Sequence, residues 1–257
     1  MKIGFFDSGF GGLSVLHEAL QLMPDQQYLF FADQAHVPYA EKTKEEIIRY
    51  TDDSISFLIK QGCEAIVVAC NTATSAAVEI LRRKYDIPIV SMEPAVKKAL
   101  EEHEGKCLVM ATPYTLQGDK LHNLLQRIDG MELATLLPMP MLVRFAENRQ
   151  FTGEEVTEYI RKQISVYDFS EYGSVVLGCT HFNYFKDTLR NLLPPHVAIV
   201  DGNEGTVRQL KRRLPEQKEE EHPSVTYYIS GDKVTDATML KTFEQLLIRL
   251  DGMREIR

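Results

Sequence analysis

Two cysteines with matching surroundings lie far apart in the chain. EAIVVACNTATS (64–75) and GSVVLGCTHFNY (173–184) are apolar, β-branched runs that stop at Cys70 and Cys179, each followed at once by small hydroxyl or amide side chains. Such runs predict buried strands. A thiol at a strand end, where a helix begins, lies beside backbone N–H groups and a helix dipole that favour a thiolate. The matching contexts favour a chemical role for both cysteines over simple burial.

Stereoinversion at a carbon next to a carboxylate is a reaction that needs a thiol on each of two opposed faces. One thiolate removes the proton from one face while the opposite thiol delivers a proton to the other, and a substrate of opposite handedness exchanges the two roles. General acid–base catalysis works best with groups whose pKa lies near the working pH, and thiols can be brought there. Backbone N–H groups at the strand ends stabilise the negative charge that develops.

The same residues leave other chemistries open. Cys179 and His181 match the thiol and base of a hydrolase, although that mechanism gives Cys70 no role. A zinc site needs third and fourth ligands, and no second Cys-x-His or CxxC motif supplies them, so we expect no metal. Redox exchange between the two cysteines is another alternative, as is a small acidic-ligand binding module without catalysis. Cys63 and Cys107 are interpreted as small buried side chains.

An acidic residue precedes a glycine-rich turn near the start of the chain. In FFDSGFGGLS (5–14), Asp7 ends an apolar run, and the glycines that follow permit close approach of the backbone to a ligand. No Lys-Ser or Lys-Thr follows, so this is not a Walker loop, and the third glycine of the dinucleotide fingerprint is missing. We therefore expect Asp7 and Ser8 to face a ligand cleft.

Short apolar runs that alternate with amphipathic stretches predict an α/β fold with mostly parallel sheets. Capping boxes at 43–46 and 152–155 predict the starts of two helices. The predicted strands are 2–7, 28–33, 64–70, 87–93, 106–112, 131–139, 174–179, 196–202 and 224–232, and further helices are predicted over 13–23, 76–85, 121–128 and 237–250. The pattern divides into two α/β units. Because ligands bind beyond the carboxyl ends of parallel strands, two facing sheets would bring both cysteines into one inter-domain cleft.

Composition excludes several classes of protein. The chain has 257 residues, 44% of them hydrophobic, which suits one large domain or two small ones. A net charge of −8 argues against a nucleic-acid partner. No apolar run approaches the ~18 residues of a membrane span, and the N-terminus does not match a signal peptide. Four cysteines without CxxC spacing predict a reduced, cytoplasmic protein, and the charge run 215–223 predicts a solvated connection.

Six motifs together resemble one family. In order they are DSGFGGLSVL (7–16), VPYAEKT (37–43), ACNTAT (69–74), EPAVKKAL (93–100), LGCTHF (177–182) and SGD (230–232). Over essentially its whole length the chain resembles the glutamate racemases of the cofactor-independent, two-cysteine aspartate/glutamate racemase superfamily. The resemblance implies two pseudo-symmetric α/β/α domains with the active site between them. The first would comprise 1–94 and 206–257, because the C-terminal helix returns to it, and the second 95–205.

The resemblance also implies roles for the motif residues. Cys70 and Cys179 would be the two proton-transfer residues, one per enantiomer, with Asp7 and His181 beside them to tune their protonation. Glu147, in LVRFAEN, matches a further acidic position near the second cysteine and is included among the catalytic residues. The residues expected to bind substrate are Asp7, Ser8, Pro38, Tyr39, Ala40, Asn71, Thr72, Thr112, Thr180 and His181.

The implied reaction is racemisation of L-glutamate to D-glutamate by a thiolate/thiol pair, with no cofactor. The product would supply peptidoglycan synthesis, and thereby cell-wall biogenesis and cell shape. A homodimer is expected because the family is often dimeric, and no nucleic-acid or membrane partner is expected. An aspartate racemase of the same superfamily is the close alternative.

Two positions depart from the family pattern. Ala40 stands where the family commonly has Gly, and a positive φ there would cost an alanine on the order of 1 kcal/mol. Asn183 stands where the family commonly has Pro after the CTH-aromatic motif. Both positions are expected to border the site and to affect rate and substrate preference.

Overall fold

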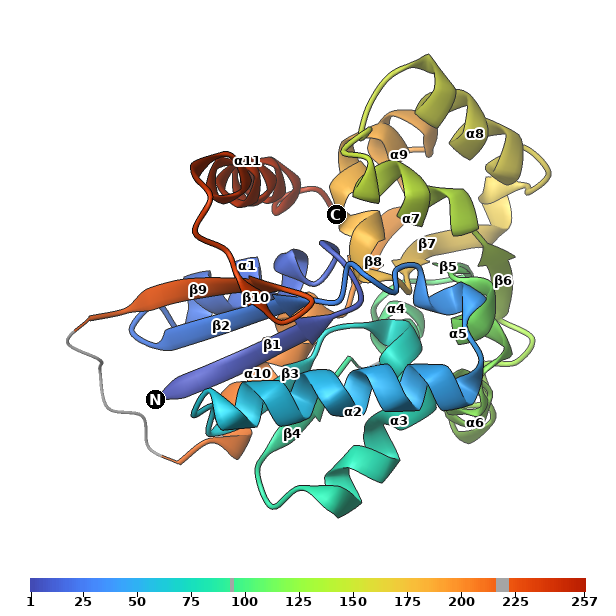
Figure 1. The fold of residues 1–257 in the computed structure, drawn as a ribbon. Helices are drawn as coiled ribbons and strands as arrows, with labels where there is room; N and C mark the ends of the chain where they lie inside the picture. The colour runs from blue at the N-terminus through green and yellow to red at the C-terminus, as the bar shows by residue number, and fades with distance from the viewer. Residues whose placement is uncertain (93–94, 216–221) are drawn as a thin grey trace.

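The protein folds into two mostly parallel sheets with helices on both faces of each (Figure 1). The structure is a computed structural model that describes residues 1–92, 95–215 and 222–257. Strands of the first sheet come from both ends of the chain, whereas the second sheet is built from the middle. The predicted fold class, α/β with mostly parallel sheets, is confirmed.

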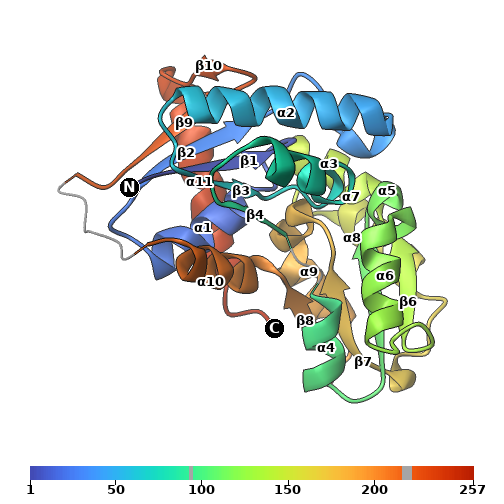
Figure 2. The ribbon, with the colours of Figure 1, turned by 90° about the horizontal axis from the view of Figure 1, so that it is seen from below.

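The first sheet has the strand order β10-β9-β2-β1-β3-β4, and all its pairings are parallel except that of β10 with β9. Its strands are β1 (Lys2–Asp7), β2 (Gln27–Ala32), β3 (Ala65–Val68), β4 (Ile89–Ser91), β9 (Ser224–Ile229) and β10 (Asp232–Lys233). Helices α1 (Leu13–Leu22), α10 (Asn203–Arg213) and α11 (Ala237–Met253) contribute to the core on one face, and α2 (Lys44–Lys60) and α3 (Asn71–Lys84) to the core on the other. Figure 2 shows α2 on the opposite side of this sheet from α1 and α10.

Alternation of side chains along β1 explains this layering. Phe5 packs in the same apolar cluster as Leu16 of α1, whereas the next residue, Phe6, packs in the cluster that contains Ile55 of α2. Successive side chains of a strand point to opposite faces, so an uninterrupted apolar run builds two cores at once.

The second sheet has the order β6-β5-β7-β8 and is parallel throughout. Its strands are β5 (Lys106–Ala111), β6 (Ala134–Pro138), β7 (Tyr172–Leu177) and β8 (Ala198–Asp201). Helices α4 (Val96–Glu102), α5 (Pro113–Gln117) and α6 (Asp119–Arg127) share one core cluster, and α7 (Pro140–Glu147), α8 (Glu154–Ile164) and α9 (Lys186–Leu192) share another. Short 3-10 helices occur at η1 (Tyr39–Glu41), η2 (Phe169–Glu171) and η3 (Thr180–Phe185).

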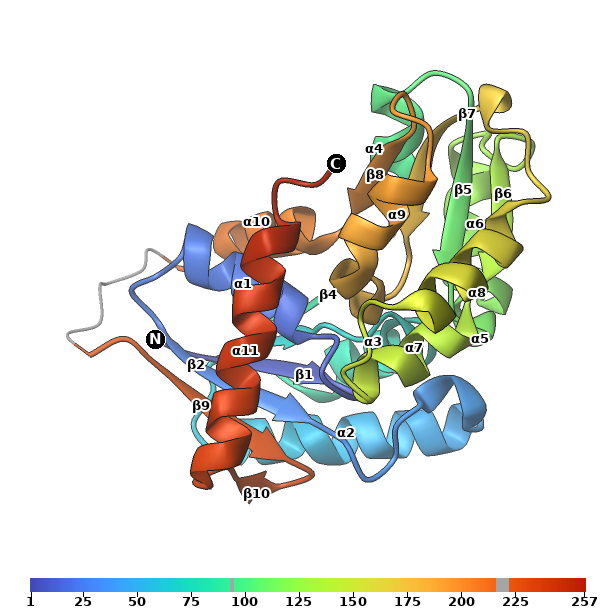
Figure 3. The ribbon, with the colours of Figure 1, turned by 90° about the horizontal axis from the view of Figure 1, so that it is seen from above.

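One apolar core joins the two sheets. The cluster that contains Phe5 of β1 also contains Val175 of β7, Leu142 of α7 and Phe243 of α11. The helix α11 lies across the first sheet and also contacts η3 of the second unit (Figure 3). This shared core fixes the position of one sheet relative to the other, and with it the two edges at which the parallel strands end. The elements α1, α11 and η3 lie at the junction between the sheets.

Most predicted elements have an observed counterpart. The predicted strands correspond to β1–β9 with ends shifted by a few residues, and the Thr43 capping box with Glu46 is present at the start of α2. The capping box predicted at 152–155 is wrong, because Gly153, at φ +110°, is the N-cap of α8 and no side chain caps it. No helix within the described residues is long and apolar enough to cross a membrane.

The two-domain division stays a prediction. The strands of the first sheet lie within 2–91 and 224–233 and those of the second within 106–201, but the boundary drawn at 205–206 would cut the first turn of α10. Most of the predicted solvated connection, 215–223, and the junction at 93–94 lie outside the described residues.

Candidate active site

The two strand-end cysteines line one pocket. β3 ends at Val68 and β7 at Leu177, so Cys70 and Cys179 each lie two residues beyond a parallel strand. The cavity between them is small, at about 20 Å³. Its lining residues are Ser8, Pro38, Tyr39, Ala40, Cys70, Asn71, Thr72, Thr112, Val143, Cys179, Thr180 and His181. The structure thus brings together nearly all the residues predicted to bind substrate, while Asp7 and Glu147 lie behind this lining.

Cys70 occupies a helix N-terminus. It is the N-cap of α3, and its Sγ accepts the backbone N–H of Ala73 at 3.4 Å and donates to Ser8 Oγ at 3.5 Å. Burial and the nearby Asp7 carboxylate raise the pKa of the Cys70 thiol above its ordinary value, although the N–H and hydroxyl contacts oppose this. The Cys70 sulfur is therefore held as a thiol, with a backbone donor ready to stabilise its anion.

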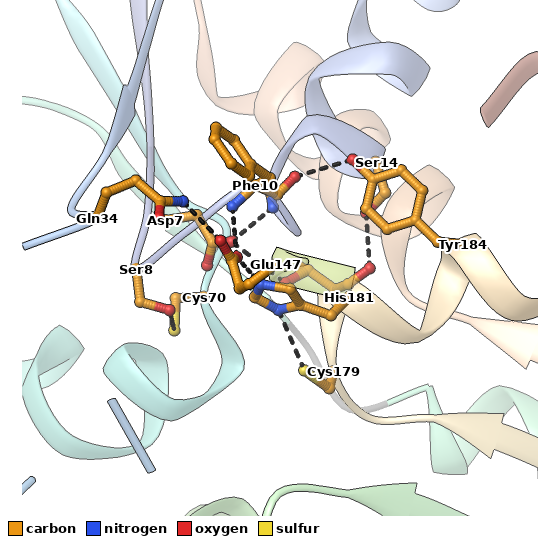
Figure 4. Close-up of polar contacts among 12 residues, drawn as sticks. Asp7, Ser8, Phe10, Ser14, Gln34, Cys70, Glu147, Cys179, His181 and Tyr184 are labelled. Atoms are coloured by element: carbon orange, nitrogen blue, oxygen red, sulfur yellow. Dashed lines mark hydrogen bonds and ion pairs between the residues drawn. The ribbon is translucent and has the colours of Figure 1, made fainter. Parts of the chain in front are cut away.

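Cys179 has different surroundings. The helix expected immediately beyond it is present, but it is the 3-10 helix η3, and the Cys179 side chain makes no cap hydrogen bond. Its Sγ instead lies 3.7 Å from Nδ1 of His181, and Nε2 of His181 lies 2.5 Å from Oε1 of Glu147 (Figure 4). Burial alone lowers the pKa of His181, but the contacts with Cys179 and Glu147 raise it well above its ordinary value. A cation thus adjoins the Cys179 sulfur.

Glu147 ends α7 and lies against the glycine-rich loop. Its Oε1 accepts the backbone N–H of Phe10 at 2.8 Å, and its Oε2 accepts Nε2 of Gln34 at 2.7 Å. Burial alone raises the pKa of Glu147, but its hydrogen bonds and the charge of His181 lower it below its ordinary value. The carboxylate is ionised, and it fixes the orientation and charge of His181.

Asp7 ends β1 and is fully buried. Its Oδ2 accepts the backbone N–H of Gly12 at 2.6 Å and the hydroxyl of Thr180 at 3.4 Å, whereas its Oδ1 has no hydrogen-bond partner among the described residues. Burial is the main reason why the pKa of Asp7 is raised, and the charge of Glu147 adds to it. A raised pKa makes the carboxyl group beside Cys70 easier to protonate than an exposed aspartate.

Close packing explains the glycines of the loop. A Cβ at Gly9 would lie 2.0 Å from Oε1 of Glu147, and a Cβ at Gly11 would lie 2.5 Å from Nδ1 of His181. Neither glycine has a positive φ. These positions therefore require glycine for the approach of the loop to the second unit, not for an unusual backbone conformation.

Hydroxyl and amide side chains at the starts of α3 and α5 also line the pocket. Thr72 Oγ1 lies 3.1 Å from Thr112 Oγ1, which lies 3.0 Å from Thr115 Oγ1. Thr72 stands in the first turn of α3, where free backbone N–H groups attract anions. The buried Oδ1 of Asn71 has no hydrogen-bond partner among the described residues. These groups offer donors for a carboxylate and an acceptor for an ammonium group.

Sequence reasoning missed several residues that hold the site. Asp33, buried just after β2, accepts the hydroxyl of Tyr39 at 2.6 Å and so fixes a pocket-lining ring. Gln34 binds Glu147, Thr115 joins the threonine cluster and Val143 lines the pocket. A signal for Asp33 was present, because YLFFAD ends in an acidic residue as FFD does.

The two departures from the family pattern have different positions. Ala40 lines the pocket, and its φ is not positive, so alanine carries no backbone penalty there. Asn183, expected to border the site, does not line this pocket; its Nδ2 donates to the backbone O of Thr180 at 3.1 Å. Among the described residues, no group of three or more His, Cys, Asp or Glu side chains is placed to hold a metal ion.

Comparisons of the sequence and of the structure with known proteins both find racemases. Residues 13–210 match the Asp/Glu/Hydantoin racemase family. The glutamate racemase of Campylobacter curvus is 48% identical over 266 residues, covering all of both chains. The crystal structure of glutamate racemase from Campylobacter jejuni subsp. jejuni aligns over all of both chains with a TM-score of 0.82 and 26% identity. Escherichia coli glutamate racemase, solved in complex with L-glutamate and the activator UDP-MurNAc-ala, aligns over 98% of this chain and 94% of its own with a TM-score of 0.79 and 27% identity.

Proposed function

The chain belongs to the Asp/Glu/Hydantoin racemase family, among the glutamate racemases, and we propose that it interconverts L- and D-glutamate by proton transfer at Cys70 and Cys179. It is an amino-acid racemase. One observation supports the two-thiol mechanism: two thiols from two different sheets line a single pocket whose other lining residues include hydrogen-bond donors. The glutamate bound in the related Escherichia coli enzyme supports the choice of substrate.

The mechanism begins with unequal protonation of the two thiols. The imidazolium of His181 favours the thiolate at Cys179, and burial near Asp7 favours the thiol at Cys70. The Cys179 thiolate takes the α-proton of one enantiomer, so the C–H bond breaks and its electron pair stays on carbon. The S–H of Cys70 then gives its proton to the opposite face of that carbon. The product has inverted configuration, and the pair is left as a Cys179 thiol and a Cys70 thiolate.

The opposite enantiomer uses the reverse assignment. The Cys70 thiolate, stabilised by the N–H of Ala73 and the hydroxyl of Ser8, removes the proton, and the Cys179 thiol returns one. Between turnovers the resting protonation is restored by exchange with water, with Asp7 and His181 as the adjacent proton carriers.

We assign substrate contacts to the pocket walls. Thr72, Thr112 and Thr180 donate to the carboxylates, and Asn71 Oδ1 accepts from the ammonium group, with Ser8 beside it. The side of the pocket near η1 is closed by Pro38, Tyr39 and Ala40, which limit the length of the substrate side chain. The donors around the carboxylate stabilise the carbanion-like transition state.

Optical rotation tests this function. We expect purified protein, dialysed and reduced, to bring L-glutamate and D-glutamate to the same racemic end point without added cofactor, and to act far more slowly on L-aspartate. Faster loss of rotation with aspartate would identify an aspartate racemase instead. No loss of rotation with either amino acid, together with a covalent acyl adduct at Cys179, would support the hydrolase alternative.

Three further proposals concern the cell. We propose that the D-glutamate formed enters peptidoglycan synthesis, so that loss of the enzyme makes growth depend on added D-glutamate. A cytoplasmic location is consistent with the four free cysteines, Cys63, Cys70, Cys107 and Cys179. We also propose a homodimer, which light scattering of the 29.3 kDa chain would detect as twice that mass.

A further inference from the structure

Tyr184 carries a buried hydroxyl that the mechanism above does not use. The residue belongs to η3, directly downstream of Cys179, and its side chain is fully buried. Its hydroxyl donates to the backbone O of Phe10 at 2.9 Å, and Phe10 lies in the glycine-rich loop after β1. The bond therefore crosses from the second unit to the first, close to the pocket (Figure 4).

Phe10 links this bond to the catalytic side chains. Its carbonyl accepts the Tyr184 hydroxyl, and its N–H donates to Oε1 of Glu147 at 2.8 Å. The same Oε1 contacts Nε2 of His181. A shift of Phe10 therefore displaces the backbone N–H that holds Glu147, the partner of His181. His181 in turn lies beside Cys179.

Tyr184 is itself held firmly in place. Its backbone O accepts Nη2 and Nε of Arg249 at 2.7 and 3.1 Å, and Arg249 also binds Asp187. Its ring stacks on Phe151 at 4.8 Å between centroids. Arg249 belongs to α11, so the terminal helix and η3 together fix the position of the Tyr184 hydroxyl. The glycine-rich loop therefore adjusts to Tyr184, and Tyr184 does not adjust to the loop.

We propose that Tyr184 is a positioning residue for the Cys179 half of the site. Its hydroxyl fixes Phe10, and Phe10 fixes Glu147. Glu147 then keeps His181 oriented and charged beside Cys179. The proposal rests on the proposed racemisation for its kinetic consequences, but the hydrogen-bond chain itself does not depend on the substrate.

The titratable groups that face His181 come from three elements. They are Cys179 after β7, Glu147 at the end of α7 and Asp7 at the end of β1. The contacts with Cys179 and Glu147 raise the pKa of His181 against the effect of burial. Loosening Glu147 removes part of that effect, so the pKa of His181 falls and its positive charge is lost at a lower pH.

Tyr184→Phe removes only the hydroxyl, and Tyr28→Phe is a matched control. Tyr28 is also buried, and its hydroxyl donates to the backbone O of Met23 at 2.6 Å, away from the pocket. In Tyr184→Phe we expect kcat to fall about threefold to tenfold, the effect of one hydrogen bond, with KM little changed. The alkaline limb of its kcat–pH profile should move to lower pH, whereas Tyr28→Phe should keep the wild-type profile.

NMR titration of the imidazole nitrogens tests the chain of contacts without turnover. The His181 signal, assigned by its loss in His181→Asn, should titrate at lower pH in Tyr184→Phe than in the wild type and in Tyr28→Phe. In a Glu147→Gln background, Tyr184→Phe should have no further effect on that signal. An unchanged midpoint would overturn the proposal, as would a Tyr184→Phe protein that melts far below Tyr28→Phe. A wild type that fails to racemise glutamate would reject the function but leave this titration informative.

Discussion

The two halves of the pocket present the same atom in different surroundings. On one side, the Cys70 sulfur caps α3 and contacts a backbone N–H and the Ser8 hydroxyl, with Asp7 nearby. On the other side, the Cys179 sulfur precedes a 3-10 helix and faces His181, which is paired with Glu147. One half therefore relies on a helix N-terminus and the other on an ion pair.

This difference bears on the proposed reaction, in which one sulfur acts as the base, the other acts as the acid, and a substrate of opposite handedness exchanges the two roles. Unlike surroundings give the two thiol/thiolate arrangements of the pair unequal populations. The cation at His181 favours charge at Cys179, while burial and the Asp7 carboxylate disfavour charge at Cys70. The glycine-rich loop contacts both halves, because Asp7 binds Thr180 and Phe10 binds Glu147.

Loss of either thiol should have the largest effect. We expect Cys70→Ser and Cys179→Ser each to lower kcat for racemisation by roughly 10²- to 10⁴-fold, because a serine hydroxyl is a far weaker proton donor and acceptor at neutral pH. Initial rates measured by circular dichroism from each enantiomer would give this value. Cys63→Ala, which changes a buried cysteine outside the pocket, should keep kcat near that of the wild type. Near-normal racemisation by either serine variant would refute the two-thiol mechanism.

Replacement of Asp7 or His181, each of which lies beside one of the two cysteines, should directly reveal the difference between the two halves of the pocket. Both His181→Asn and Asp7→Asn should lower kcat/KM by about tenfold to a hundredfold. With α-deuterated glutamate, His181→Asn should give its larger isotope effect for the enantiomer deprotonated by Cys179. Asp7→Asn should give its larger effect for the enantiomer deprotonated by Cys70. Equal isotope effects in both directions for both variants would mean that the helpers do not divide between the two cysteines.

A methyl group in the loop should damage one half more than the other. A Cβ at Gly9 meets Glu147 Oε1 at 2.0 Å, so Gly9→Ala must displace either the loop or the carboxylate that holds His181. We expect kcat/KM to fall about tenfold, since small misplacements of catalytic groups have effects of this size or larger. Gly205→Ala is the control, because a Cβ there meets nothing within 4 Å. Wild-type kinetics in Gly9→Ala would show that Glu147 is not held as described.

The smallest effects concern stability and have opposite signs. The folded pKa of Asp7 is raised, so its ionisation opposes folding at pH values above about 3.8, and Asp7→Asn should raise the Tm at neutral pH. The folded pKa of Glu147 is lowered, so its contribution is present above about 4.5 and is lost as pH falls through the folded value. Glu147→Gln should therefore lower the neutral Tm, and each difference, on the order of 2–4 °C per kcal/mol, should shrink toward pH 4. Calorimetry at pH 4 and 7.5 would measure both, and shifts of the same sign would contradict the assignment.

The sequence predicted which residues line the pocket better than it predicted the contacts that hold them there. Parallel strands place their carboxyl ends at one sheet edge, so Cys70 and Cys179 were predictable at equivalent positions from the apolar runs alone. The pocket-lining threonines and Asn71 follow from the same strand ends and from the family motifs. By contrast, the bonds from Tyr184 to Phe10 and from Glu147 to His181 join residues distant in the chain, and no periodicity encodes them.

Local signals also failed where tertiary packing decided the conformation. THFNYF forms the 3-10 helix η3, and its side chains Phe182, Tyr184 and Phe185 pack into the shared core, which the local sequence did not indicate. At 152–155 the predicted capping box does not form. Gly153, which has a positive φ, is the N-cap of α8 and has no side chain that could accept a hydrogen bond. The short helices α5 and α7 were missed because each begins with a proline in a stretch with too few turns to show a period.

The most direct test of the two-thiol account is the fate of the α-hydrogen in D2O. L-Glutamate would be incubated with enzyme, and deuterium at the α-carbon of both enantiomers would be measured by mass spectrometry during the first few per cent of reaction. The account predicts D-glutamate that carries solvent deuterium and remaining L-glutamate that carries none, because one thiol removes the proton and the other delivers a different one. D-glutamate that retains the original hydrogen, or L-glutamate that exchanges as fast as product forms, would show that a single base serves both faces and would contradict it.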